Sequence, residues 1–224
     1  MHSKWPDQLD IPAPYPLLGR EYKTADYAPV NLSTTNPELT DYDVHTFAGL
    51  DRYISDCRKK TGARVLYGGY LENRALYQRS PHFAQAEKAR TLHLGLDLWE
   101  DAGTPVYAPL DGWVHSFRYN DQPLDYGGTI ILTHENAEGK FHTLYGHLSR
   151  ASLTGLSVNA PIDRGTPFAT FGTPSENGGW VPHLHFQVIL DLADWSGDYP
   201  GVCAPEEQSA YRNNCPDPAV FMLI

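Results

Sequence analysis

The stretch TLHLGLDLW, residues 91–99, alternates leucine with residues of a different kind. Leucine stands at positions 92, 94, 96 and 98, and His93, Gly95 and Asp97 stand between them. Successive side chains of a β-strand point to opposite faces. A single strand here would bury its leucines in a core and present His93 and Asp97 together on the other face, with Gly95 leaving that face open. The pattern predicts a half-buried strand whose polar side chains lie on the open face.

Residues 88–190 continue as short strand-like runs separated by turn signals. The runs include GWVHSFRY, GTIILTH, KFHTLYGHL and HLHFQVIL, and the turns include PLDG, DYGG and ENAEGK. No long helical pattern intervenes, which argues against parallel βαβ units. We therefore expect a mainly β protein whose residues 88–190 form one antiparallel β-sheet domain.

Residues 1–87 are expected to form an N-terminal extended and helical segment. Residues 1–42 are rich in proline and show no period, which is typical of an extended arm. Apolar residues at helical spacing then predict one helix at about 43–61, with Asp43 as its cap and its end before Gly62. The run at 63–83 fits either two short strands around a glycine turn or a loop beside a cleft.

Within that run, Glu72 or Asn73 could reach a functional site, although simple packing is the expected role. Residues 191–224 contain runs such as SGDYPGV and CPDP and are expected to be a loop-rich tail.

Composition excludes several classes of protein. The chain has 224 residues and a formal net charge of −10, which argues against a nucleic-acid partner. No apolar run approaches the roughly 20 residues of a membrane-spanning helix, so we expect no membrane insertion. The first residues show no secretory signal pattern, which favours a cytoplasmic protein, or a periplasmic or extracellular one if a signal has been removed.

Three cysteines, Cys57, Cys203 and Cys215, are too few for a disulfide framework. Free thiols are expected, and a Cys203–Cys215 pair is the alternative in an oxidising compartment.

Two further stretches repeat the arrangement of the first. In VPHLHFQV, residues 181–188, His183 and His185 share a strand face with Gln187. In LYGHL, residues 144–148, His147 stands directly before the last leucine. Each short motif alone would occur by chance. Together they place four histidines and one aspartate on strands with an apolar back, and nitrogen and oxygen ligands around an open position suit catalytic zinc. The residues alone leave open which histidine of HLH faces a metal.

Two other interpretations of these residues compete with a catalytic metal site. A structural zinc site would more often use cysteines, and none lies near these motifs. The remaining histidines are expected to be ordinary surface or loop residues without a role: His2, His45, His82, His115, His134 and His142.

From about residue 93 to 188 the sequence resembles the lysostaphin-like (LytM-type) zinc metallopeptidases, which cut peptide bonds in bacterial peptidoglycan. The resemblance rests on HLGLD, GTPVYAPLDG, DYGGTIILTH, LYGHL and PHLHF. It implies an antiparallel β catalytic domain with an active-site groove and one Zn²⁺ ion. It further implies that His93, Asp97 and His185 bind the zinc, and that His147 and His183 are catalytic and assist the water and the developing oxyanion.

The resemblance implies a zinc-dependent endopeptidase acting on peptidoglycan peptides or another small peptide. Alternatives are a cytoplasmic zinc amidase or peptidase with a small non-wall substrate, and a non-catalytic LytM-type module. The complete ligand set disfavours the last of these. Gln187, Trp180 and Asn159 depart from the family pattern, and we expect these positions to line the substrate groove and leave the metal site intact. The oligomeric state is left open.

Overall fold

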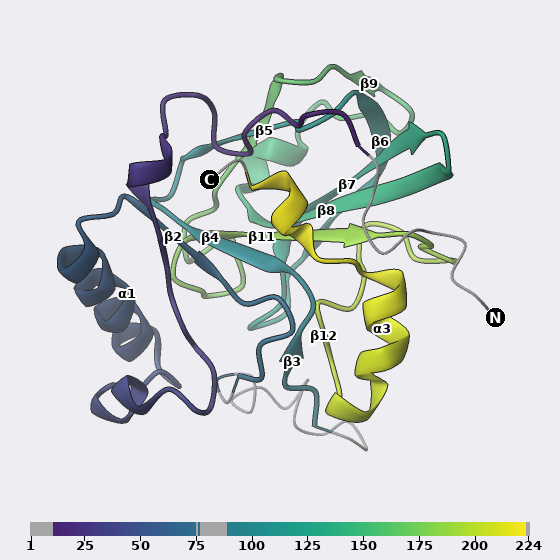
Figure 1. The fold of residues 1–224 in the computed structure, drawn as a ribbon. Helices are drawn as coiled ribbons and strands as arrows, with labels where there is room; N and C mark the ends of the chain where they lie inside the picture. Colours follow the sequence, from purple (N-terminus) through teal and green to yellow (C-terminus); the bar gives the residue numbers. More distant parts are fainter. Residues whose placement is uncertain (1–10, 75, 77–88, 223–224) are drawn as a thin grey trace.

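The computed structural model describes residues 11–74, 76 and 89–222, and its main element is an eight-stranded sheet (Figure 1). The strand order is β1 (Tyr27–Pro29), β2 (Val65–Gly68), β4 (Leu96–Trp99), β11 (His183–Ile189), β8 (Gly139–Leu148), β7 (Gly127–Asn136), β6 (Gly112–Asn120) and β9 (Pro161–Ile162). Every neighbouring pair is antiparallel except β1–β2. The prediction of a mainly β, antiparallel fold is therefore confirmed.

Smaller elements surround this sheet. Two strand pairs flank it, namely β10 (Pro167–Thr170) with β5 (Pro105–Tyr107), and β12 (Val202–Cys203) with β3 (Leu92–His93). Helix α1 (Phe47–Thr61) lies beside β2, and helix α3 (Gln208–Asn214) lies near β12 (Figure 1). The 3-10 turns are η1 (Thr24–Asp26), η2 (Pro37–Asp41), η4 (Arg150–Leu153), η5 (Pro205–Glu207) and η6 (Pro218–Phe221). Among the described residues, no helix has the length and apolarity needed to cross a membrane.

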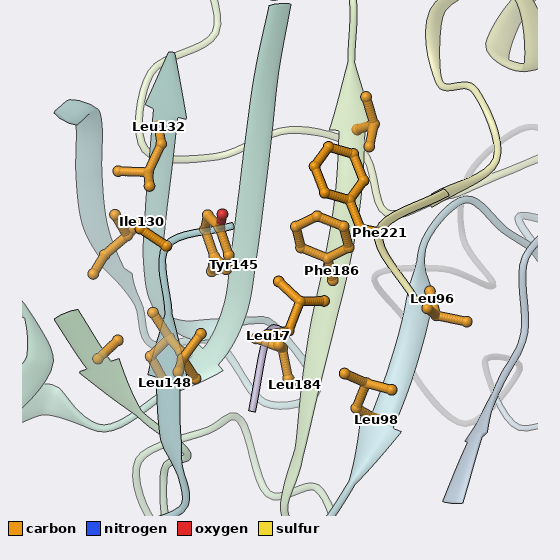
Figure 2. Packing of buried hydrophobic residues seen from close by; sticks show 14 of the residues in the cluster. Leu17, Leu96, Leu98, Ile130, Leu132, Tyr145, Leu148, Leu184, Phe186 and Phe221 are labelled. Atoms are coloured by element: carbon orange, nitrogen blue, oxygen red, sulfur yellow. The ribbon is translucent and has the colours of Figure 1, made fainter. Parts of the chain in front are cut away.

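One face of the large sheet carries the main hydrophobic core (Figure 2). Leu98 of β4, Ile130 of β7 and Leu184 of β11 are completely buried there, and Leu17 and Phe221 cover them from the two ends of the chain. Burying a side chain of this size stabilises the fold by about 1.5–3 kcal/mol. The leucine face therefore anchors the strands, and the opposite face carries a second apolar cluster, with Ile131 and Ile189, beside the polar groups of the site.

The leucine-rich stretch at 91–99 differs from its prediction because it forms two strands. Leu92 and Leu94 pack against Cys203 in a small cluster, whereas Leu96 and Leu98 enter the main core. The chain breaks between β3 and β4, where the Leu94 amide donates to the carbonyl of Gly201. Strand β3 thus pairs with β12, whereas β4 pairs within the large sheet. The prediction of a single alternating strand over residues 91–99 was wrong.

The N-terminal segment is joined to the sheet through β1 and β2. Helix α1 ends as predicted, with Gly62 in the left-handed conformation at φ 72°. The predicted cap was wrong, because Thr46, not Asp43, accepts a hydrogen bond from the Gly49 amide. The run at 63–83 begins with one strand, β2, followed by a turn at Gly69; its later part lies largely outside the described residues.

Helix α3 lies in the segment expected to be a loop-rich tail. The sequence there, QSAYRNN, shows no clear apolar period, and the helix was not foreseen.

His134 was wrongly expected at the surface. It lies on β7 with 1% of its area exposed, Nδ1 donates to the carbonyl of Asp111, and Nε2 lies 2.8 Å from Thr143 Oγ1. His115 and His142 lie partly buried on β6 and β8, and His45 is exposed. The last two of the six, His2 and His82, lie outside the described residues.

Burial lowers the pKa of His134 to about 4. The unfolded chain, with an ordinary histidine pKa near 6.5, binds this proton at higher pH than the folded chain does. Stability is therefore lost as the pH falls from above 6.5 toward 4. We expect this residue to account for a loss of about 2 kcal/mol in unfolding free energy between pH 7.5 and 5.0.

Urea unfolding of the wild type and of His134→Gln at both pH values measures this contribution as the difference between their pH slopes. Equal slopes for the two proteins would contradict the assignment of the buried neutral imidazole.

Candidate metal centre

Three strands bring His93, Asp97 and His185 together. His185 of β11 is the direct register partner of Asp97 on β4, and His93 stands at the end of β3. The distance from His93 Nε2 to His185 Nδ1 is 2.9 Å, and Asp97 Oδ1 lies 3.3 Å from the first and 3.2 Å from the second of these nitrogens. All three side chains are buried. Within the described part of the chain, they form a group suited to hold a metal ion.

The donor atoms fit a zinc ion. Tetrahedral zinc with bonds of about 2.0–2.1 Å separates its ligand atoms by about 3.3 Å, which is close to the separations found here. Asp97 Oδ1 is buried and makes no hydrogen bond of ordinary geometry in the described residues. A buried carboxylate oxygen in this state is costly unless a cation meets it. Two imidazoles and one carboxylate also match the ligand types that zinc accepts.

Gly95 makes the approach of His185 possible. A Cβ atom at position 95 would lie 2.5 Å from Cε1 of the His185 ring. Gly95 was expected to leave its strand face open, and the space that it leaves is taken by the imidazole ring of His185.

Neighbouring oxygens fix which nitrogen of each ligand histidine carries the lone pair. His93 Nδ1 donates to the carbonyl of Gly69 at 2.9 Å, so its Nε2 carries the lone pair that could bind a cation. His185 Nε2 lies 3.0 Å from Gln187 Oε1, and the amide of Gln187 donates to the Pro200 carbonyl and to Cys215 Sγ. The Gln187 oxygen is therefore the acceptor, and Nδ1 of His185 faces the metal position.

Gln187 was expected to line the substrate groove and is instead fully buried behind a ligand candidate. Two cavities of about 250 Å³ and 30 Å³ lie beside these residues. Asn159 lies in an exposed turn with φ 66° and lines neither of them. Trp180 does line both of those cavities.

The N-terminal segment also supplies Arg74, which the sequence analysis missed. Arg74 Nη1 donates to Asp97 Oδ2 at 2.6 Å, and Arg74 Nε donates to Glu72 Oε2 at 2.6 Å. Both arginine and aspartate side chains are almost completely buried. This ion pair occupies Oδ2 and leaves only Oδ1 of Asp97 for a metal. Nothing in the spacing of residues 74 and 97 signals the contact.

The electrostatics of the cluster keep the carboxylate charged and the imidazole neutral. Burial alone raises the pKa of Asp97, but the adjacent guanidinium of Arg74 opposes this effect, and that pKa is held well below its usual value. Burial, together with the charge of Arg74, lowers the pKa of His93 to about 3. Metal binding requires this combination of an ionised carboxylate and a neutral imidazole.

His147 and His183 lie next to each other beside this cluster, with ring centroids 4.2 Å apart. His183 Nδ1 donates to the Val181 carbonyl at 2.7 Å, and its Nε2 lies 4.0 Å from Asp97 Oδ1. His147 Nδ1 donates to the Asn177 carbonyl at 2.9 Å. Burial lowers the pKa of both histidines. Each ring is therefore neutral near neutral pH, with the lone pair on Nε2.

The position of His147 depends on an irregular backbone. It has φ 63°, which is uncommon for a residue other than glycine, and it lies where the register of β7 with β8 shifts. Such backbone often occurs at functional sites. The motif LYGHL marked this residue as a candidate, but its conformation could not be read from the sequence.

Because Gln187 fixes the His185 tautomer, we expect Gln187→Leu to weaken zinc affinity by about 10- to 100-fold. Gln187→Glu keeps an acceptor for Nε2–H and is the matched control, expected to stay within about 10-fold of the wild type. Chelator competition titrations measure both affinities. Wild-type affinity in Gln187→Leu would show that the amide does not orient this ligand.

Comparisons with known proteins find similarity in the part of the chain that carries these residues. Residues 91–194 match the model of peptidase family M23. An uncharacterized metalloprotease of Haemophilus influenzae is 30% identical over 99 residues, which are 44% of this chain and 19% of that protein. The chain thus spans about a fifth of the length of this curated relative.

Two solved structures are similar over about half of the chain. A zinc-containing peptidase from Vibrio cholerae is 28% identical, covering 44% of this chain and 27% of that one with a TM-score of 0.36. The catalytic domain of the antimicrobial peptidase lysostaphin from Staphylococcus simulans is 24% identical, covering 52% and 77% with a TM-score of 0.37. With its motifs in order and its histidine–aspartate cluster assembled, the segment at residues 91–194 is a peptidase family M23 domain.

Proposed function

We propose that the protein is a zinc-dependent endopeptidase that hydrolyses peptide bonds, with peptidoglycan peptides as the first substrate class to test. The observation that carries the proposal is the placement of two neutral histidines directly beside a buried set of three metal-ligand candidates. A structural metal site would need no such pair. The match of residues 91–194 to peptidase family M23 supports the same reaction class.

In this proposal His93, Asp97 and His185 hold one Zn²⁺ ion. When bound, zinc at such a site lowers the pKa of a coordinated water to about 7 and polarises a carbonyl group. Arg74 keeps Asp97 ionised and occupies Oδ2, so that only Oδ1 is available to the ion. The Gly69 carbonyl and the Gln187 amide orient the two imidazoles.

His147 and His183 handle the proton. Their Nε2 atoms carry lone pairs because both Nδ1–H groups are engaged by carbonyls, so either ring can accept a proton from the attacking water. The protonated ring can then donate a hydrogen bond to the developing oxyanion or a proton to the leaving amine. The chain has no H-E-x-x-H motif to supply a glutamate for this task.

A zinc amidase or peptidase with a small non-wall substrate is the second candidate. The observation that favours it is that residues of the N-terminal segment, Leu32 and Leu50 among them, line one side of the site. A non-catalytic module would have no need for the paired histidines.

Alanine substitution should separate ligand from proton-transfer roles. His93→Ala, Asp97→Ala and His185→Ala are expected to lose zinc. His147→Ala and His183→Ala are expected to keep zinc and to lose peptidase activity by about 100-fold or more. Elemental analysis of the purified variants and a muropeptide and short-peptide digestion assay provide the two readouts.

The buried His134, which lies outside the site, is the matched control, and His134→Gln should keep both zinc and activity. Full zinc stoichiometry in His185→Ala would overturn the ligand assignment. Zinc-loaded wild-type protein without activity on any peptide would overturn the peptidase proposal.

A further inference from the structure

Trp99 lies directly across from His183 on the neighbouring strand. The two residues are register partners of β4 and β11, two positions along from the pair formed by Asp97 and His185. Residues two apart on a strand point to the same face. The face that carries the metal-ligand candidates therefore also carries an indole ring, opposite one of the two histidines that are proposed to handle the proton.

The rings of Trp99 and His183 are stacked on each other. Their planes are inclined by 20° and their centroids are 5.6 Å apart, which is within the range of attractive offset stacking. Both residues line the smaller of the two cavities, together with the three ligand candidates. The stacked imidazole thus borders the space in which the attacking water would lie.

Hydrogen bonding alone does not fix the His183 ring. In the part of the chain that the structure describes, its one hydrogen bond runs from Nδ1 to the carbonyl of Val181. A single bond at one nitrogen does not set the plane of the ring, so ring contacts must do so. Among the neighbouring rings, that of Trp99 is nearly parallel to the imidazole, whereas those of His147 and Trp180 are inclined by 40° and 89°.

The indole is itself held by the N-terminal segment. Trp99 is 2% exposed and packs in the apolar cluster that also contains Leu50 and Ile54 of α1. The guanidinium carbon of Arg74 lies 5.7 Å from the centroid of the indole, a distance at which a cation is attracted to the face of an aromatic ring. These supporting groups lie outside residues 91–194, so the orientation of a histidine inside the family domain depends on packing outside it.

We propose that Trp99 is a positioning residue for the hydrolytic step, in which its indole holds the imidazole plane of His183 so that Nε2 faces the attacking water. The inference rests on the proposed peptidase function and adds to it a support that the N-terminal segment supplies. A displacement of a reacting group by about 1 Å can lower a rate by about 100-fold. Trp99 is not a ligand candidate and does not line the larger cavity, so zinc affinity and substrate binding should not depend on it.

Two substitutions separate stacking from packing in the zinc-loaded full chain. Trp99→Leu keeps an apolar side chain but offers no ring face, whereas Trp99→Phe keeps a ring opposite His183. On a peptide that the wild type cleaves, we expect Trp99→Leu to lower kcat by about 10- to 100-fold with KM within about threefold. Trp99→Phe should stay within about threefold of the wild type in both constants.

Ile54→Ala is the matched control, because it removes volume from the same cluster but does not line the cavity, and it should keep the wild-type kcat. An unchanged kcat in Trp99→Leu, or an equal loss in Trp99→Leu and Trp99→Phe, would overturn the positioning role. Chelator competition gives the zinc affinities. A clear loss of zinc affinity in Trp99→Leu would also overturn that role, since the indole would then support the ligands instead of His183.

Proton NMR of the zinc-free protein gives a readout that needs no turnover. In the wild type and in Trp99→Phe, we expect nuclear Overhauser contacts between the ring at position 99 and the His183 imidazole, and one narrow set of His183 ring signals. In Trp99→Leu these signals should broaden or double, because the ring samples more than one orientation.

A single narrow set of His183 ring signals in Trp99→Leu would overturn the positioning role. The absence of the ring contacts from the wild type would do so as well, which keeps the test decisive if the leucine variant does not fold. Both NMR outcomes are independent of peptide cleavage. A wild type that cleaves no peptide would therefore overturn the proposed function without deciding whether the indole holds the ring, which the NMR signals decide.

Discussion

The buried carboxylate of Asp97 constrains the whole arrangement. An ionised group in this position is costly to desolvate, and losing one partner of such a buried pair typically costs about 3–5 kcal/mol. The fold meets this cost on one oxygen with Arg74 and leaves the other oxygen among imidazoles. The leucine face of the sheet fixes β4 and β11 in register, which places His185 opposite Asp97. The same pair of strands thus contributes to the core and brings together two of the three metal-ligand candidates.

The N-terminal segment is part of this centre. Strands β1 and β2 extend the sheet beyond β4, the Gly69 carbonyl orients His93, and Arg74 neutralises Asp97. The family match at residues 91–194 includes none of these groups. The same segment also lines the cavity around the candidate ligands through Leu32 and Leu50. Residues outside the recognised domain therefore contact the candidate metal ligands directly and border the cavity beside them.

The sequence predicted the fold class, and it marked five candidate site residues through local signals. Alternation marked His93, Asp97, His183 and His185, and the motif LYGHL marked His147. The assignment of His185 to the metal and of His183 to the proton came from the family resemblance and stays a prediction. What failed depends on contacts between distant segments. The break after Leu94 arises because β3 and β4 pair with different strands, and the contact of Arg74 with Asp97 joins residues 23 positions apart. Gln187 was expected in the groove because it departs from the family pattern, and the sequence does not show that its side chain contacts His185. His134 was expected at the surface because its partners lie on other segments.

The most direct measurement is the anomalous difference density at the zinc absorption edge in crystals of the zinc-loaded protein. We expect one peak within about 2.0–2.2 Å of His93 Nε2, Asp97 Oδ1 and His185 Nδ1, with Arg74 still bonded to Oδ2 of Asp97. A peak held by another set of residues, or an Asp97 that binds the metal through both oxygens with Arg74 displaced, would contradict it.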